Sequence, residues 1–158
     1  MLNNKLNDIE LYKIIEETKH YEDKKAASIE ALKIVQNSRG WISDQLMYEI
    51  SAILCISVSQ LEEIATFYSQ IYRQPVGRNI IKYCDSVVCY MMGCNKIQLI
   101  LEDILKIKPG CTTIDHKFTL LPISCLGNCD KAPVLMINSI TYSNVNSTCI
   151  PILLEKCK

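Results

Sequence analysis

Cys84-Asp-Ser-Val-Val-Cys89 and Cys125-Leu-Gly-Asn-Cys129 are the two stretches around which the rest of the chain is organised. Each follows an apolar run that favours a buried strand, Asn79-Ile-Ile-Lys-Tyr83 in the first case and Phe118-Thr-Leu-Leu-Pro-Ile123 in the second. A loop that leaves a rigid sheet can direct its side chains to one point, because the sheet fixes its distance from the neighbouring loop. The pattern therefore predicts that four thiols converge beyond the ends of two strands.

Four cysteines suit either a tetrahedral zinc ion or an iron-sulfur cluster. Structural zinc sites mostly use two cysteines separated by two residues, whereas the pairs here are separated by four and three residues. This wider spacing favours a [2Fe-2S] centre, whose chemistry is one-electron transfer. Gly127 lets backbone amides approach the sulfurs, and Lys131 can offset the charge added on reduction. A zinc site that only holds the two loops together stays open as an alternative.

The other cysteines differ in how close they lie to these pairs. Cys94 continues the even spacing of Cys84 and Cys89 and can replace Cys89 as a ligand, so the ligand set of the first loop is open at this point. The rest are isolated and are interpreted as packing or surface thiols: Cys55, Cys111, Cys149 and Cys157. No Cys-x-x-Cys occurs, which makes a redox disulfide of the thioredoxin type a weaker alternative.

Composition and charge argue against several classes of function. The 158 residues contain 17 basic and 17 acidic side chains, so net charge gives no attraction to nucleic acid or to an anionic membrane. No stretch approaches the ~20 apolar residues of a membrane span, and the charged N-terminus does not fit a signal peptide. We expect a cytosolic protein, in which thiols stay reduced, and an odd total of nine cysteines cannot all pair.

The chain before the first cysteine pair is predicted to be helical. Apolar spacing indicates four short helices, over residues 8–20, over residues 23–39, after Ser43, and from Ser59, where Ser-Gln-Leu-Glu62 matches a capping box. Gln74-Pro-Val-Gly77 then interrupts helical geometry. We therefore expect a helical N-terminal region at residues 1–75 and a second domain at residues 76–158.

The second domain is predicted to mix strands with helices. Residues 97–105 form one helical apolar face, residues 134–137 and 140–142 a hairpin, and residues 150–156 a last helix. Together with the two strands this is an α/β or α+β layer pattern. The glycines form neither a dinucleotide fingerprint nor a P-loop, so any nicotinamide or flavin is expected on a partner. No catalytic residue for hydrolysis is identified.

Several blocks together resemble a known family. They are Cys-x4-Cys, Cys125-Leu-Gly-Asn-Cys-Asp-Lys-Ala-Pro133, Ala26-Ala-Ser-Ile-Glu-Ala-Leu-Lys33, Arg39-Gly-Trp41 and Ala65-Thr-Phe-Tyr-Ser69. From about residue 21 to the C-terminus, the chain closely resembles the E chain of bacterial NADH-quinone oxidoreductase, respiratory complex I. The resemblance implies a thioredoxin-like [2Fe-2S] ferredoxin domain behind a bundle of short helices. It implies one cluster with Cys84, Cys89, Cys125 and Cys129 as ligands, and it leaves Cys94 outside the family pattern.

The same resemblance implies a role within an assembly. The chain is expected to be an electron-transfer subunit without a complete active site of its own, next to a flavoprotein F chain that binds NADH and FMN and to other peripheral-arm subunits. The complex couples NADH oxidation and quinone reduction to proton translocation, and the subunit is expected on the cytoplasmic side of the inner membrane without inserting into it. A looser resemblance to subunits of NAD-linked hydrogenases and formate dehydrogenases gives the alternative function.

Overall fold

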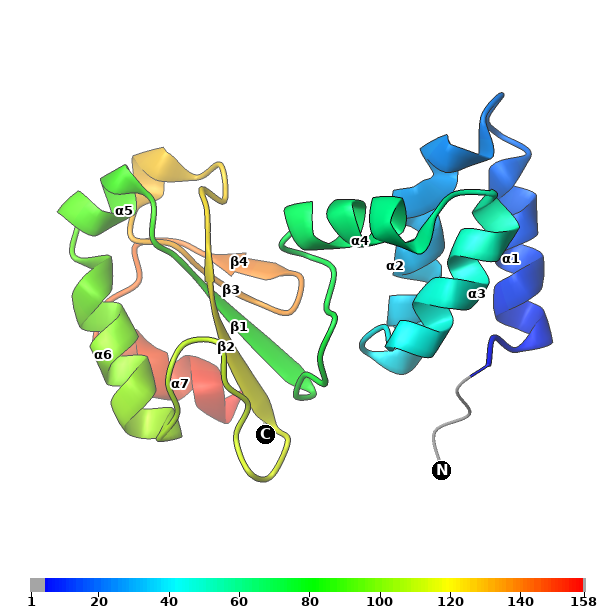
Figure 1. The fold of residues 1–158 in the computed structure, drawn as a ribbon. Helices are drawn as coiled ribbons and strands as arrows, with labels where there is room; N and C mark the ends of the chain where they lie inside the picture. The colour runs from blue at the N-terminus through cyan, green and yellow to red at the C-terminus, as the bar shows by residue number, and fades with distance from the viewer. Residues whose placement is uncertain (1–4, 158) are drawn as a thin grey trace. The chain divides into compact units, whose positions relative to one another are not determined.

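The computed structural model describes residues 5–157, and the chain divides into a unit that ends at Pro75 and a unit that begins at Val76. The first unit is helical and the second contains a four-stranded sheet (Figure 1). No single helix within the described part of the chain is long and apolar enough to cross a membrane. The helices Asp44–Leu54 and Val58–Phe67, which are bent relative to each other, are together long and apolar enough by length and composition alone.

The first unit consists of α1 (Asp8–Thr18), η1 (Lys24–Ala27), α2 (Ser28–Arg39), α3 (Asp44–Leu54) and α4 (Val58–Phe67). Each of these helices presents apolar side chains to one core, as its sequence spacing predicts. The largest side chains that are fully buried in this core are Ile14, Leu32, Ile42, Met47, Ile50, Leu54 and Leu61. Helices therefore follow one another up to Phe67, and the single helix expected over residues 23–39 is divided into η1 and α2.

The start of α4 differs from the prediction. Its N-cap is Ser57, whose hydroxyl accepts a hydrogen bond from the Gln60 backbone N–H, while the Gln60 side chain accepts one from the Ser57 N–H. The predicted cap at Ser59 is wrong because glutamine completes a capping box as well as glutamate does. Tyr68 follows the end of α4 and is 42% exposed.

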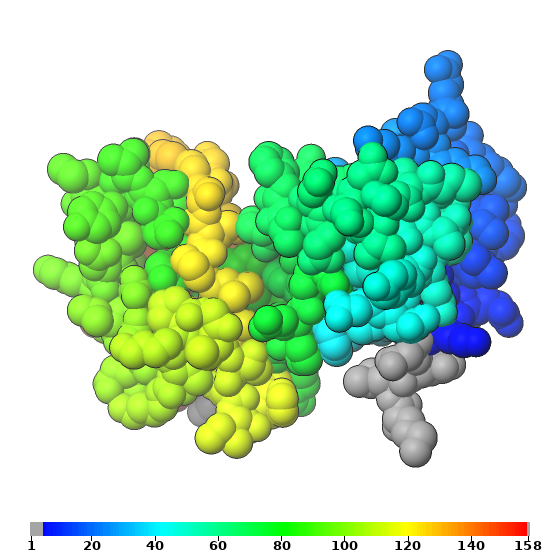
Figure 2. All heavy atoms as spheres, viewed as in Figure 1, coloured from blue at the N-terminus to red at the C-terminus, as the bar shows by residue number. Residues whose placement is uncertain are grey.

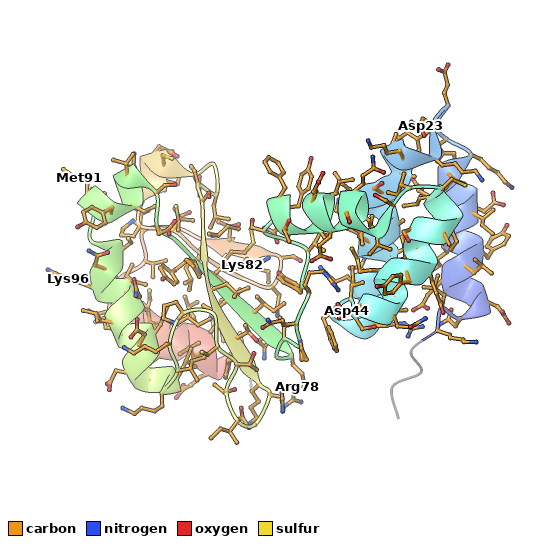
Figure 3. The ribbon with its side chains drawn as sticks, in the orientation of Figure 1. Asp23, Asp44, Arg78, Lys82, Met91 and Lys96 are labelled. Atoms are coloured by element: carbon orange, nitrogen blue, oxygen red, sulfur yellow. The ribbon has the colours of Figure 1, made fainter. Side chains whose placement is uncertain are left out.

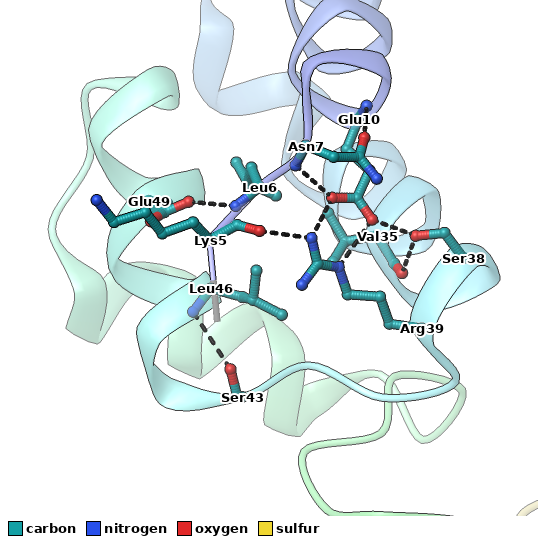
Figure 4. Close-up of polar contacts among 10 residues, drawn as sticks. All are labelled: Lys5, Leu6, Asn7, Glu10, Val35, Ser38, Arg39, Ser43, Leu46 and Glu49. Atoms are coloured by element: carbon teal, nitrogen blue, oxygen red, sulfur yellow. Dashed lines mark hydrogen bonds and ion pairs between the residues drawn. The ribbon is translucent and has the colours of Figure 1, made fainter. Parts of the chain in front are cut away.

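A buried ion pair fixes α1 to the end of α2. Arg39 donates to both carboxylate oxygens of Glu10, from Nε to Oε1 at 2.8 Å and from Nη2 to Oε2 at 2.5 Å. Figure 4 shows the Ser38 hydroxyl donating to the same carboxylate, and Asn7 exchanging capping hydrogen bonds with Glu10. Arg39 Nη2 also donates to the Lys5 carbonyl at 2.6 Å. These donors, with Arg39 the strongest influence, lower the pKa of Glu10 to about 2.

The second unit is a mixed sheet with helices against it. Its strands are β1 (Asn79–Cys84), β2 (Phe118–Ile123), β3 (Leu135–Ile137) and β4 (Ile140–Tyr142), and its helical segments are α5 (Val87–Met91), α6 (Cys94–Leu105), η2 (Cys129–Lys131) and α7 (Cys149–Glu155). The strand order is β2-β1-β3-β4, with β1 parallel to β2 and antiparallel to β3. Apolar residues of α6 and α7 share one core with β1, β2 and β3, including Leu101, Ile150, Ile81, Leu120 and Leu135. The short helix α5 was not predicted.

Gly77 lies at a close approach between the segment before β1 and the start of β2. A methyl group on its Cα would come within 2.9 Å of the backbone N and C of Phe118, and its N–H donates to Thr119 Oγ1 at 2.6 Å. Because these are backbone atoms of a paired strand, they cannot move aside at low cost. We expect Gly77→Ala to lower the free energy of unfolding by about 2–3 kcal/mol.

Chemical denaturation of the wild type and of Gly77→Ala measures this difference. Gly110→Ala is the matched control, because an added methyl meets no atom within 4 Å there and carries only the cost of a left-handed backbone at φ +87°, about 1–2 kcal/mol. A Gly77→Ala variant as stable as the wild type would show that the approach to Phe118 is not tight.

Candidate metal centre

The two cysteine loops leave the sheet at the same edge. β1 and β2 are parallel, and their register places Cys84, the last residue of β1, opposite Ile123, the last residue of β2. The Asp85 N–H donates to the Ile123 carbonyl at 3.1 Å, which holds the two exits together. Parallel strands end on one side of a sheet, so the loops that carry Cys89 and Cys125 begin next to each other. The prediction that both pairs follow strand ends is confirmed.

The first cysteine pair is buried. Cys84 and Cys89 are each 1% exposed and pack with Ala132 and Val134, and a hydrogen bond joins the two thiol groups. The Cys84 N–H donates to the Val134 carbonyl at 3.1 Å, so β3 and the segment before it hold this pair from the other side. Burial is the main cause that raises the pKa of Cys89 to about 11, while a backbone hydrogen bond from Val134 lowers it. Without a metal the Cys89 thiol is therefore protonated at neutral pH.

The second cysteine pair is exposed and close together. The sulfurs of Cys125 and Cys129 lie 3.1 Å apart. The Gly127 N–H donates to Cys125 Sγ at 3.3 Å, and the residue has φ +80°, which favours glycine. The hydrogen bond from Cys129 and that from Gly127 lower the pKa of Cys125. The expectation that Gly127 brings a backbone amide to a sulfur is confirmed.

The two pairs match the arrangement of ligands around a centre with two irons. The hydrogen bond with Cys125 is the main cause that raises the pKa of Cys129, and Cys84 of the other pair adds to this shift. A tetrahedral zinc requires all its ligands at one point, whereas a [2Fe-2S] cluster requires two thiolates at each iron. Two thiol pairs at one edge of the sheet match the second requirement.

The model of the thioredoxin-like [2Fe-2S] ferredoxin family matches residues 14–158. The chain belongs to the thioredoxin-like [2Fe-2S] ferredoxin family. This membership confirms the expected fold and the expected class of cofactor, and the mixed sheet makes the chain α+β.

Two similar relatives of the chain share the same name. The chain is 59% identical to the E subunit of NADH-quinone oxidoreductase from Buchnera aphidicola subsp. Acyrthosiphon pisum, over 98% of this chain and 95% of the relative. It is 57% identical to the protein of the same name from Escherichia coli strain K12, over 90% of this chain and 86% of the relative. A solved NAD⁺-reducing [NiFe]-hydrogenase in the air-oxidized state is similar with a TM-score of 0.70 and 25% identity, over 83% of this chain and 22% of that chain.

A third buried thiol of the ferredoxin lies beside the first pair. Cys94, the first residue of α6, is 2% exposed and packs in the same cluster as Cys84 and Cys89. Burial raises its pKa, and the neighbouring Cys84 and Asp85 raise it further. The even spacing of Cys84, Cys89 and Cys94 in the sequence had indicated Cys94 as a possible ligand. The resemblance to the family, however, assigned it no role as a ligand.

The other cysteines lie outside this cluster. Cys55 and Cys111 are exposed, and Cys149 and Cys157 are half-buried. All described cysteines have free thiols, so no disulfide forms within residues 5–157. Their interpretation as packing or surface thiols agrees with these positions.

The outer side of α5 is apolar. Val87, Tyr90, Met91 and Met92 are between 57% and 78% exposed, whereas Cys89 between them is buried. Figure 3 shows Met91 pointing away from the sheet, and Figure 2 shows α5 (green) and the loop before η2 (yellow) at the same end of this unit. Apolar side chains therefore border the cysteine loops of the ferredoxin.

Proposed function

We propose that the chain is the iron-sulfur electron-transfer subunit of an NADH-quinone oxidoreductase, accepting electrons from NADH through FMN on a flavoprotein subunit. The observation that carries this proposal is 59% identity, over nearly the whole length of both chains, to a relative named as a subunit of that enzyme. The reaction belongs to the complex, because this chain has no nucleotide-binding motif and no complete active site of its own.

In this proposal Cys84, Cys89, Cys125 and Cys129 hold one [2Fe-2S] cluster, which accepts one electron when bound. Backbone hydrogen bonds to one cysteine of each pair support a role in electron transfer. Val134 donates a backbone hydrogen bond to Cys89, and the Gly127 N–H donates to Cys125. Donors to ligand sulfurs stabilise added negative charge and so favour the reduced state. Burial of the first pair keeps water from two of the four sulfurs.

The finer parts of the proposal concern the assembly. NADH and FMN bind to the flavoprotein F chain, and other peripheral-arm subunits complete the electron path to quinone. The complex couples this reaction to proton translocation, and the chain lies on the cytoplasmic side of the inner membrane as a peripheral subunit. The equal numbers of acidic and basic residues support partners that are proteins rather than nucleic acids.

Reduction by NADH tests this function. The isolated chain should stay oxidised when NADH is added, because it has no site for NADH, and should become reduced when the flavoprotein subunit with FMN is also present. Electron paramagnetic resonance measures the reduced cluster directly. Reduction by NADH without the flavoprotein, or no reduction with it, would contradict the proposal. Dithionite is the control that shows the cluster can be reduced.

Two alternative functions can each be distinguished from the proposed one by an experiment. Similarity to the NAD⁺-reducing hydrogenase is consistent with the alternative that the chain is a subunit of a hydrogenase, although it matches only 22% of that chain. A subunit of a formate dehydrogenase is the other form of this alternative. The native complex, purified through this subunit, should then oxidise hydrogen or formate rather than reduce quinone with NADH. A zinc-stabilised adaptor is the remaining alternative, and one zinc with no iron in the purified chain would favour it.

The division of the chain supports a further part of the proposal, that residues 1–75 and 76–158 are separate domains. Each unit has its own apolar core. If the helical region serves to bind the flavoprotein, a chain without residues 1–75 should keep its cluster and lose its partner. Loss of both together would contradict this division of roles.

A further inference from the structure

We call Cys84, Cys89 and Cys94 the buried half of the candidate centre, and Cys125 and Cys129 its exposed half. The buried half contains more thiols than one iron requires. Cys84, Cys89 and Cys94 are each no more than 2% exposed and form one cluster with Ala132 and Val134. Two thiolates complete the coordination of an iron in a [2Fe-2S] cluster. One of these three sulfurs is therefore surplus.

The exposed half has no such surplus. Cys125 and Cys129 lie 3.1 Å apart and are exposed, whereas Cys94 packs in the buried cluster. Loss of a ligand should therefore have different consequences in the two halves of the centre.

The segment that carries Cys89 and Cys94 can adjust locally. Cys89 lies on the short helix α5, Cys94 begins α6, and Gly93 joins them at φ +90°. No atom lies within 4 Å of the position where a Cβ of Gly93 would be, so the space around this junction is open. In contrast, Cys84 is held at the end of β1 by the backbone hydrogen bond to Val134.

We propose that Cys94 is a reserve ligand, which binds the iron of the buried half when Cys89 is not available. This inference rests on the proposed function, because it requires the cluster. In the exchange the bond between iron and the Cys89 sulfur breaks and that sulfur takes up a proton, while the Cys94 thiol gives its proton to solvent and its sulfur forms a bond to the same iron. One thiolate replaces another, so the charge and the number of ligands at the iron are unchanged, and no oxidant or reductant is needed.

The test compares full-length variants that are reconstituted anaerobically with ferrous iron and sulfide. Cys94→Ala should keep the wild-type iron and sulfide content and the wild-type resonance signal. Cys89→Ala should keep more than about half of the iron and sulfide, with shifted g-values, because a sulfur from another position binds the iron. The double variant Cys89→Ala/Cys94→Ala should lose the cluster, with iron content at least about tenfold below the wild type. Cys89→Ala/Cys111→Ala is the matched control and should behave as Cys89→Ala does.

Two results would overturn the inference while leaving the proposed function intact. One is a wild type with a cluster and a Cys89→Ala variant with none. The other is a double variant that keeps as much iron as Cys89→Ala, which would assign the replacement to another group. Circular dichroism verifies that each variant is folded. A wild type that binds no iron overturns the proposed function, and this inference with it.

Discussion

Cys129→Ala should abolish cluster binding, with iron and labile sulfide at least about tenfold below the wild type after anaerobic reconstitution. The reason is the position of this residue in the exposed pair. Its sulfur lies 3.1 Å from that of Cys125, and the additional thiol of Cys94 packs with the buried pair instead. An iron that loses one of the two exposed ligands therefore has no additional thiol on its own side of the centre. Cys125→Ser should also impair assembly, because a serine oxygen is a weaker ligand for iron than a thiolate.

Iron and sulfide assays together with the resonance spectrum of the reduced protein measure this loss. Cys111→Ala is the control, because Cys111 is exposed and lies outside the cysteine cluster. It should keep the full cluster content. A Cys129→Ala variant that binds as much iron as this control would remove Cys129 from the ligand set.

Arg39→Met should lower the free energy of unfolding of the first unit by about 3–5 kcal/mol. Methionine keeps much of the volume of the side chain but removes the charge, which leaves the carboxylate of Glu10, only 3% exposed, without its cation. Lys33→Met is the control, since Lys33 and Glu30 form an ion pair on the surface, which is worth less than about 1 kcal/mol. Urea denaturation followed by circular dichroism compares the two. Equal effects of the two substitutions would contradict a buried, stabilising pair.

The ion pair between Arg39 and Glu10 should also affect how the free energy of unfolding depends on pH. The pKa of Glu10 is about 2 in the folded chain and 4.5 in the unfolded chain, so its carboxylate stabilises the fold above pH 4.5. This contribution is lost as the pH falls from 4.5 through about 2, where the folded form also takes up the proton. Glu10→Gln should therefore show a weaker decrease in stability than the wild type over this range. Parallel pH profiles would contradict the assignment.

The sequence predicted the parts of the fold that depend on local pattern. The apolar runs indicated β1 and β2, and the spacing of Ile97 and Leu101 indicated α6. The start of α4 was placed wrongly because two overlapping capping boxes exist in Ser57-Val-Ser-Gln-Leu-Glu62, and propensity does not decide between them. The helix α5 was missed because five residues are too few to show helical periodicity.

The sequence indicated the candidate cysteines of the site, but not the hydrogen bonds and the burial that surround them. Spacing indicated two pairs of candidate ligands, the family resemblance selected Cys84, Cys89, Cys125 and Cys129 as the predicted set, and the strand ends explain why the loops begin next to each other. The hydrogen bond from Val134 to Cys89 depends on how β3 pairs with β1, which is a long-range contact without a local signal. The burial of Cys94 depends on how α6 packs, so spacing alone left its role open.

The metal content of the anaerobically purified chain tests the central claim most directly. We predict about two irons and two labile sulfides per chain, with a rhombic resonance signal that appears only after reduction. One zinc per chain, with no iron and no sulfide, would contradict the claim that these two pairs of cysteines form an electron-transfer centre.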